Sequence, residues 1–520
     1  KALEYSRHAL SIDTYHPDAN FYYGLASKAN NNIADAKDGF EIAALSPSHR
    51  SAAYAELGIL YFKENDLSKA KHYAQKSLRS NSLNLVSLQL LAVIARTEGR
   101  SNDAESILRE LESMTRLNHF VSFERYRISN SDAAKKTFTG AIRNELPHET
   151  YQWLADFYSD LGLLSDAETL LALSPKNTEV LYRLAYVRDL IKSGSGKDVL
   201  TEADKSSPLL VFPFRESSAK ALTWAITQTN DWKPRYLLGL IYWSRDNHDK
   251  AKEMFASAGE PTFAPFYAAR AELKKDESYA SDIKRAAQLD PGQWRYGKLL
   301  AEHLLELKDY PGALKVAQDY QKRFAGDFRI DMLAAKALLL NKQYKASSTL
   351  LAKTTILPYE GATDGRQLHR EAWLMQAIDQ LKAKNHKAAL ASIEKAKIWP
   401  ENLGAGRPYD DMLDLRLENY LEALVYEQSK QKDKAQARIE AITSAKSSRR
   451  HNALDLITAL AYKKAGRSSE GENILKDWKE KQPNSKLAQW AYEAYNGQAV
   501  ETDLDGNDFR VIKRVISELK

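Results

Sequence analysis

The stretch from Ser51 to Asn81, SAAYAELGILYFKENDLSKAKHYAQKSLRSN, contains one complete unit of a pattern that recurs along the chain. It has two helical faces of small or apolar residues, which are Leu57, Gly58 and Tyr61 on the first and Ala70, Ala74 and Ser77 on the second. Between these faces, Glu64, Asn65 and Asp66 form a polar break suited to a tight turn. The stretch therefore predicts two antiparallel helices whose small residues allow their backbones to approach closely.

The pattern recurs with a period of about 34 residues. This step carries Gly58 back to Gly24 and forward to Ala92, and it carries Ala70 back to Ala36 and forward to Ala104. Similar pairs of small residues follow later, namely Ala301 with Ala313, Ala334 with Ala346, Ala377 with Ala389, Ala423 with Ala435, and Ala459 with Gly471. The period resembles that of the tetratricopeptide repeat. The resemblance implies an all-α fold, a right-handed superhelix (an α-solenoid) of about eleven helix pairs.

Composition excludes several classes of protein. Lys and Arg number 75 against 69 Asp and Glu, a net charge of only +6, and the basic residues are spread along the chain, which argues against nucleic-acid binding. The absence of cysteine removes disulfides, thiol catalysis and zinc–thiolate sites, and it fits a periplasmic or cell-surface protein better than a cytoplasmic one. No apolar run approaches the roughly 18 residues that span a bilayer, so we expect no membrane span.

The phase of the repeats predicts the organisation of the chain. The opening residues KALEYSRHALSID match the second helix of a repeat whose first helix is missing, so we expect a carboxy-terminal piece of a longer protein. We expect a first array over residues 1–192, including a divergent helix pair at 115–147. An irregular junction at 193–231, a second array at 232–484 and capping helices at 485–520 are expected to follow.

Motifs for nucleotides and metals are weak. The segment SGSGKD at 193–198 resembles a phosphate-binding loop, but it follows a predicted helix and has Asp198 where a Ser or Thr would bind magnesium. The eleven histidines show no ligand spacing. Acidic residues near Asp503 suggest calcium ligands, yet a turn that starts the last helix explains them better. We therefore expect neither a cofactor nor a metal.

Two long loops are candidates for a binding site. Ile356 to Arg366 and Trp399 to Asp410 each follow the second helix of a repeat, so both are expected on one edge of the solenoid. Their candidate binding residues are Glu360, Arg366, Trp399, Glu401, Asn402, Arg407 and Tyr409. Two interpretations stay open. These side chains form a joint polar and aromatic site, or the loops pack on one another and a Glu pairs structurally with an Arg.

A third candidate is the apolar loop that ends in Phe212, Pro213, Phe214 and Arg215. We expect Phe212, Phe214 and Arg215 to be presented to a partner, since exposed aromatic side chains anchor proteins or stack on sugar rings. The nearby aromatic residues Trp224, Tyr236 and Trp243 have helical spacing, so we expect them to be buried.

These three stretches also carry a more specific resemblance. VFPFRESSAKALTWA with WKPRYLLGLIYW, then ILPYEGATDGR, then AKIWPENLGAGRPYDDMLDLR resemble the carboxy-terminal repeats of large bacterial proteins in which an uncharacterised β-rich domain precedes tetratricopeptide repeats. That upstream domain is similar to the β-sandwiches of carbohydrate-active proteins. The resemblance thus implies a bacterial, extracytoplasmic protein with a link to carbohydrates.

Two functions follow from this sequence. The first is a noncatalytic scaffold that binds a protein partner, or the upstream domain of the same protein, through its concave face or its loop edge. The second is the helical half of a carbohydrate-active enzyme that binds a glycan, with Glu360 or Glu401 as acid or base. The sequence does not decide whether the chain is catalytic.

Overall fold

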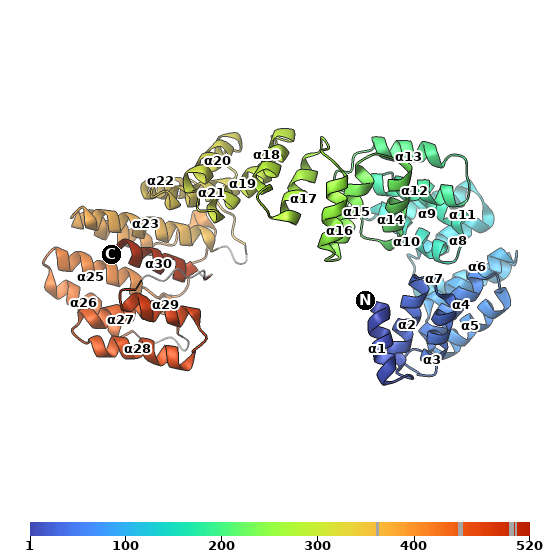
Figure 1. Cartoon of the computed structure of the whole chain (residues 1–520), viewed down its shortest axis with the longest axis horizontal. Coiled ribbons are helices and arrows are strands. Elements are labelled where there is room, and N and C mark those ends of the chain that lie inside the picture. The colour runs from blue at the N-terminus through green and yellow to red at the C-terminus, as the bar shows by residue number, and fades with distance from the viewer. Residues whose placement is uncertain (360–362, 446–450, 499–503, 505–506, 520) are drawn as a thin grey trace. The chain divides into compact units, whose positions relative to one another are not determined.

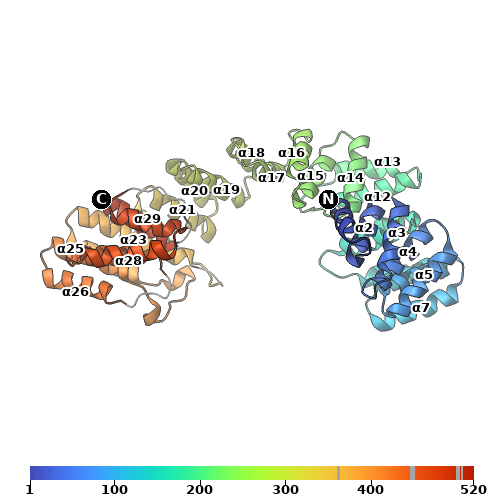
Figure 2. The same cartoon turned by 60° about the horizontal axis from the view of Figure 1, so that its bottom comes forward.

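The computed structural model describes residues 1–359, 363–445, 451–498, 504 and 507–519. Throughout these residues the regular elements are helices, and most of them pack as consecutive antiparallel pairs (Figures 1 and 2), which confirms the predicted all-α class of stacked helix pairs. They group into two compact units, Lys1–Pro261 and Thr262–Lys520. No helix in the described ranges has both the length and the apolar character needed to cross a bilayer.

The first unit holds sixteen helices. Its seven pairs are α2 (Pro17–Ala29) with α3 (Ile33–Ala43), α4 (Arg50–Lys63) with α5 (Leu67–Ser80), α6 (Leu85–Thr97) with α7 (Ser101–Met114), α8 (His119–Ser129) with α9 (Asp132–Ala141), α10 (Pro147–Asp160) with α11 (Leu164–Leu173), α12 (Thr178–Leu190) with α13 (Gly196–Lys205), and α15 (Lys233–Ser244) with α16 (His248–Ser257). Two helices stand outside these pairs: α1 (Ala2–Ile12) packs on α2, and α14 (Glu216–Gln228) packs on α12 and α15.

The described residues of the second unit form fourteen α-helices. Its six pairs are α17 (Ala264–Lys274) with α18 (Tyr279–Leu289), α19 (Trp294–Glu306) with α20 (Tyr310–Arg323), α21 (Phe328–Leu340) with α22 (Tyr344–Leu351), α23 (Asp364–Lys382) with α24 (His386–Lys397), α25 (Arg416–Gln428) with α26 (Lys432–Thr443), and α27 (Leu454–Lys464) with α28 (Ser468–Lys481). The last two helices are α29 (Lys486–Tyr495) and α30 (Asn507–Leu519).

The pair α4 and α5 shows why small residues recur. Ala70 and Ala74 are fully buried where α5 crosses α4, and a side-chain carbon added at Gly58 would lie only 3.3 Å from the backbone oxygen of Ala70. Leu57 and Leu60 of α4 are also buried, and each contributes about 1.5 to 3 kcal/mol through removal of apolar surface from water. The faces predicted from Ser51 to Asn81 are therefore confirmed.

Each helix pair turns through a residue in the left-handed backbone conformation. This residue has a positive φ in all thirteen described pairs: Asn31, Asn65, Gly99, Asn130, Gly162, Lys192, Asp246, Lys275, Lys308, Lys342, Lys384, Lys430 and Gly466. In the first pairs it recurs at the predicted period, since 65 − 31 and 99 − 65 both equal 34. The following backbone N–H closes the turn, as when Asp66 N donates to the Tyr61 carbonyl at 2.9 Å.

Side chains at the helix starts reinforce these turns. The Asp66 carboxylate accepts a hydrogen bond from the Lys69 N–H at 3.0 Å, and the Asn84 side chain accepts one from the Ser87 N–H, also at 3.0 Å. Such caps satisfy backbone donors that the first turn of a helix leaves without partners. The polar breaks in the sequence thus both end one helix and start the next.

Three segments add detail to the expected organisation. The divergent residues 115–147 form the pair α8 and α9, as predicted. Residues 193–231, for which we expected an irregular junction, contain α13 and α14 and lie within the first unit. The pattern of small residues did not indicate the pair α17 and α18, which helps to explain why the described pairs exceed the expected eleven or so.

The last two helices take different positions. We expected both to cap the end of the array. α29 does pack on α27 and α28, which form the last pair. α30 instead turns back and lies beside α23 and α27, the first helices of their pairs (Figure 1).

Candidate functional site

The two long loops predicted as a site pack directly on one another. The Ile356 N–H donates to the Asn402 carbonyl at 2.8 Å, and the buried side chains of Ile356 and Leu403 share a small apolar cluster with Leu351. The second loop contains two short 3-10 helices, η1 (Glu401–Leu403) and η2 (Asp410–Met412). Gly404 follows η1 with φ of 73°, and a side-chain carbon there would lie 3.0 Å from the Ile356 carbonyl oxygen, so this close approach requires glycine.

Asn402 is the polar link between these loops. Its amide nitrogen donates to the backbone oxygen of Leu351 at 3.0 Å and to that of Thr354 at 2.7 Å. Both acceptor residues are buried. The amide therefore satisfies the carbonyls at the end of α22 and is not directed toward a ligand.

We expect Asn402→Ala to lower the stability of these loops by about 1 to 2 kcal/mol, because two buried carbonyls lose their donor. This loss of stability is measured as faster hydrogen exchange of the Ile356 amide. Asn419→Ala provides the control, since it changes the same residue type in helix α25 away from the loops and should leave Ile356 protection unchanged. Unaltered exchange in Asn402→Ala would show that the loops do not depend on this link.

Arg366 lies under Trp399. Its guanidinium donates to the Ala396 carbonyl at the end of α24 at 2.9 Å and lies 4.7 Å from the centre of the Trp399 ring. The side chain is buried, and two of its nitrogens have no hydrogen-bond partner among the residues that the structure describes. Burial, more than the nearby charge of Arg370, lowers the pKa of this guanidinium to about 10. The position fits a helix C-terminus, whose carbonyls favour a cation.

The remaining loop candidates do not meet at one point. Glu360 lies outside the described residues. Glu401 is exposed, Arg407 is exposed and pairs with Asp410, and Tyr409 is 79% exposed. The structure therefore brings Arg366 to Trp399 and buries the Asn402 link, whereas the other described candidates face solvent separately. Their role in binding stays a prediction.

The Phe212 loop is held from below by an ion-pair network. Phe212 and Phe214 are exposed, whereas Val211 and Pro213, which alternate with them along the chain, are buried. The Arg215 guanidinium lies 4.4 Å from the centre of the Phe214 ring and pairs with Glu149 and Asp156 of α10. The two phenylalanine side chains are therefore accessible at the surface. Their presentation to a partner stays a prediction.

The aromatic residues predicted as buried divide into two groups. Tyr236 is buried. Trp224 and Trp243 are only half-buried, contrary to the expectation. The Trp224 indole N–H donates to Asp189 at 3.0 Å, which explains why its polar edge stays at the surface.

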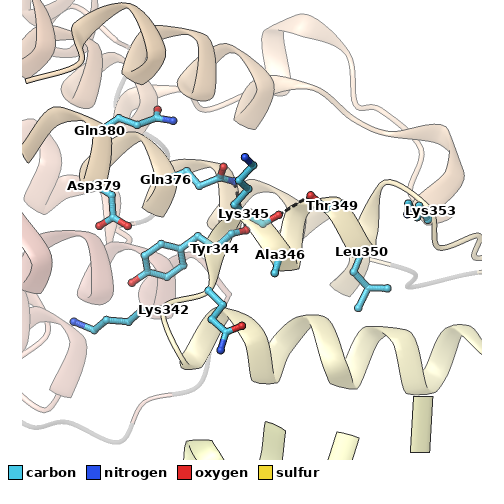
Figure 3. Close-up of a pocket in the computed structure, with 11 residues that line it drawn as sticks. Lys342, Tyr344, Lys345, Ala346, Thr349, Leu350, Lys353, Gln376, Asp379 and Gln380 are labelled. Carbon is cyan, nitrogen blue, oxygen red and sulfur yellow. Dashed lines mark hydrogen bonds between the residues drawn. The ribbon is translucent and has the colours of Figure 1, made fainter. Parts of the chain in front are cut away.

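An open groove lies along α22 in the second unit, with a volume of about 830 Å³. It is lined by Lys342, Gln343, Tyr344, Lys345, Ala346, Thr349, Leu350 and Lys353, and by Gln376, Asp379 and Gln380 of α23. Lys342, Tyr344 and Asp379 lie at one end and Lys353 at the other (Figure 3). A second hollow of about 480 Å³ shares Gln343 and extends along α20 past Lys315 and Lys322. We call the first of these the α22 groove.

The walls of the α22 groove are held rigidly by hydrogen bonds. The Gln376 amide donates to Ser348 at 2.9 Å, and Ser392 donates to Gln380 at 2.8 Å. The Thr349 hydroxyl donates to the Lys345 carbonyl at 2.7 Å (Figure 3). The groove is therefore formed before any ligand arrives.

The charge of the α22 groove is positive. Lys342 forms an ion pair with Glu518 at 2.7 Å, whereas Lys345 and Lys353 are exposed and have no acidic partner among the described residues. Asp379 is the one acid in the lining, and burial raises its pKa. Burial, helped by the charge of Glu518, also raises the pKa of Tyr344 to about 12, so this phenol stays neutral. The free lysines can bind carboxylates.

The α22 groove was not predicted from the sequence. Lys345, Thr349 and Lys353 are spaced four residues apart, which places them on one polar face of α22 and its following turn. Such a face usually meets only solvent. The spacing could have indicated the exposed face, but the hollow beside it also depends on how α23 packs on α22, which the spacing within α22 does not show.

Comparisons with known proteins agree with the helix pairs. Residues 51–82 and 233–258 match the model of the tetratricopeptide repeat, and these segments correspond to α4 with α5 and to α15 with α16. The chain therefore contains tetratricopeptide repeats. No curated protein matches the chain.

Solved structures of repeat proteins give distant likenesses. The structure of Naa15/Naa10 bound to HypK-THB has 15% identity and a TM-score of 0.29, with 98% of this chain and 91% of that chain covered. The carboxy-terminal part of a TPR repeat-containing protein from Cytophaga hutchinsonii has 12% identity and a TM-score of 0.30, with 53% and 93% covered. Yeast Tom70 has 16% identity and a TM-score of 0.26, with 91% and 98% covered. These values are too low to transfer a partner or an activity to this chain.

Proposed function

We propose that the chain is a protein-binding scaffold whose α22 groove binds an acidic segment of a partner protein. One observation carries this proposal: the groove is open and preformed, and it presents Lys345 and Lys353 without acidic partners among the described residues. Tetratricopeptide repeats provide the rigid support that such a surface needs. A preformed groove loses little conformational entropy when a segment binds.

The chemistry of the lining favours a polypeptide ligand. Leu350 and Tyr344 offer apolar surface, Gln380 and Thr349 offer hydrogen bonds, and the lysines offer charge. Because Lys345 and Lys353 are exposed, their attraction for carboxylates weakens as salt rises, with a screening length of about 8 Å at physiological ionic strength. The affinity is therefore expected to fall at high salt.

The test uses the full chain and a displayed library of random twelve-residue peptides. We expect the enriched peptides to be acidic and to bind Lys345→Glu/Lys353→Glu at least tenfold more weakly than the unchanged chain, measured by fluorescence anisotropy. Lys252→Glu/Lys284→Glu makes the same change of charge on α16 and α18 and should bind as the unchanged chain does. Failure to enrich any peptide, or equal affinity for both double variants, would overturn the proposal.

The expectations about the origin of the chain, its parent protein and its upstream partner remain proposals. The bacterial origin and the upstream domain as partner rest on the sequence resemblance, and the larger parent protein rests also on the phase of the repeats. The second candidate, the helical half of a carbohydrate-active enzyme, requires convergent carboxylates; of its two candidate residues, Glu360 lies outside the described residues and Glu401 is exposed. We therefore propose protein binding as the function.

A further inference from the structure

α30 occupies a surface that the repeats build without it. The seams of α23 with α24, α25 with α26, and α27 with α28 each lie between the two helices of one pair. α30 belongs to none of these seams, since it packs on the first helices α23 and α27, and its Phe509 ring lies 4.8 Å from the Trp490 ring of α29 (Figure 1). We call the surface beneath α30 the α30 seat.

The face that α30 turns to its seat is apolar. Phe509, Val511, Ile512 and Val515 are buried, and Ile516 and Leu519 are partly buried against the same core. Phe509, Ile512 and Ile516 recur at the spacing of one helical face. α30 is therefore an amphipathic helix of the kind that binds in hydrophobic grooves.

Charged side chains fix the ends and the middle of α30. The ion pairs are Asp508 with Arg370 at 3.0 Å, Arg514 with Glu371 at 2.7 Å, and Glu518 with Lys342 at 2.7 Å and Lys382 at 3.1 Å. The order of these pairs follows the sequence of both helices, so α30 runs along α23 in the same direction. The seat thus selects a helix with acidic residues at both ends of its apolar stripe.

Arg370 of the seat has a second acidic partner beneath α30, whereas Glu371 is paired by Arg514 of α30 itself. The buried Arg370 donates two hydrogen bonds to the buried Glu418, at 2.6 and 3.0 Å. Asp508 adds a third bond from above and is itself 58% exposed as a side chain. Departure of α30 therefore leaves Arg370 with a partner, which is the requirement for a surface that exchanges one helix for another.

We propose that the α30 seat is a binding groove for an amphipathic helix, that α30 occupies it as an internal ligand, and that a partner helix with acidic ends displaces α30. This inference rests on the proposed function, since it assumes a protein-binding scaffold. The α22 groove begins at Lys342, where Glu518 of α30 ends its contact. Since α30 runs toward the Lys342 end of the groove, a partner chain that turns back beyond its helix would bring acidic residues to Lys345 and Lys353, and this extra contact would give it an advantage over α30.

The first experiment measures whether the seat accepts a helix from outside. The probe is a fluorescein-labelled peptide with the sequence of residues 507–519, NDFRVIKRVISEL. In the full chain, Ile512→Asp/Val515→Asp removes the apolar face of the resident helix, so the peptide should bind this variant at least tenfold more tightly than the unchanged chain. Ser517→Asp adds charge on the exposed face of α30 and should change the affinity less than twofold.

The second experiment tests the location by exchanging charges. Adding Lys342→Glu/Lys382→Glu to the displaced variant should weaken peptide binding about tenfold, and a peptide with Glu518→Lys should recover it. If the displaced variant retains its helix content by circular dichroism but binds the peptide no better than the unchanged chain, the proposal is wrong. It is also wrong if the exchanged charges bring no recovery.

A third variant tests the proposal in case the double substitution Ile512→Asp/Val515→Asp unfolds the chain. If Ile512→Asp/Val515→Asp lowers the helix content of the chain, Glu518→Lys alone loosens α30 through exposed ion pairs and should raise peptide affinity about threefold. No rise would overturn the proposal. The substitutions Lys345→Glu/Lys353→Glu distinguish the proposal for the α22 groove from the proposal for the α30 seat. They should abolish binding of the acidic peptides selected from the library, whereas the α30 peptide should still bind once α30 is displaced.

Discussion

Arg96→Met is expected to lower the free energy of unfolding of the first unit by about 3 to 5 kcal/mol, because it leaves a buried carboxylate without its cation. Arg96 of α6 bonds Glu124 of α8 at 2.7 Å and Asp166 of α11 at 3.1 Å. Glu124 has no exposed surface and also accepts a hydrogen bond from Tyr158 at 2.6 Å. Arg96 therefore joins three successive helix pairs.

The pH dependence of this loss has a definite sign. Burial raises the pKa of Glu124, and the attraction of Arg96 opposes that rise. Without Arg96 the folded-state pKa rises further above its unfolded value. The destabilisation is then present above the unfolded pKa and disappears as the pH falls below it, where the carboxyl is protonated in both states.

Hydrogen exchange of the α6, α8 and α10 amides measures this prediction, because unfolding of a repeat chain is not a single transition. Arg100→Met is the control. Arg100 also pairs with two acids, Glu98 and Asp103, but its side chain is 37% exposed and solvent screens these pairs, so its loss should have a much smaller effect. Arg96→Met/Glu124→Gln should recover part of the stability. Equal effects of Arg96→Met and Arg100→Met would contradict the buried network.

Gly39→Val should destabilise the pair α2 and α3 by about 2 to 3 kcal/mol through overpacking. A side-chain carbon at Gly39 would lie 2.7 Å from the Asn20 carbonyl oxygen and 2.9 Å from the Gly24 nitrogen. Both atoms belong to the backbone of α2, so no side-chain movement relieves the contact and the helices must separate.

Gly140→Val is the matched control for this substitution. Gly140 also lies within a helix, α9, but nothing lies within 4 Å of a side-chain carbon placed there. The free energy of unfolding of the pair α8 and α9 should change by less than about 0.5 kcal/mol in this variant, as at other surface sites. Urea titration followed by hydrogen exchange compares the two variants, with the α2 and α3 amides read in Gly39→Val and the α8 and α9 amides read in Gly140→Val. A Gly39→Val chain as stable as the control would show that the seam tolerates a larger residue.

The sequence predicted the seams of the helix pairs because they are local. Ala36, Ala70 and Ala104 are all fully buried, as the period required, since each lies opposite a small residue of its partner helix only about a dozen positions earlier. Short-range packing of this kind leaves a direct record in the spacing of small residues. The tight turns were likewise visible as polar breaks.

The binding surfaces could not be predicted because distant residues build them. Lys342 and Glu518 are separated by 176 positions, yet they form the ion pair at which the α22 groove and the α30 seat meet. Arg366 was predicted as a ligand-binding residue, but its closest contacts are the end of α24 and the Trp399 ring. A spacing rule reports which residues face a neighbouring helix, and it carries no information about hollows between successive pairs.

The left-handed turn inside each helix pair has a consequence for how such a chain can change over evolution. Since each described pair closes through its own turn and packs mainly on its neighbours, natural selection can add or remove a whole unit and still leave two surfaces that match. Loss of only part of a unit would instead bring together helix faces that do not match. Families built in this way are therefore free to vary in length by whole steps.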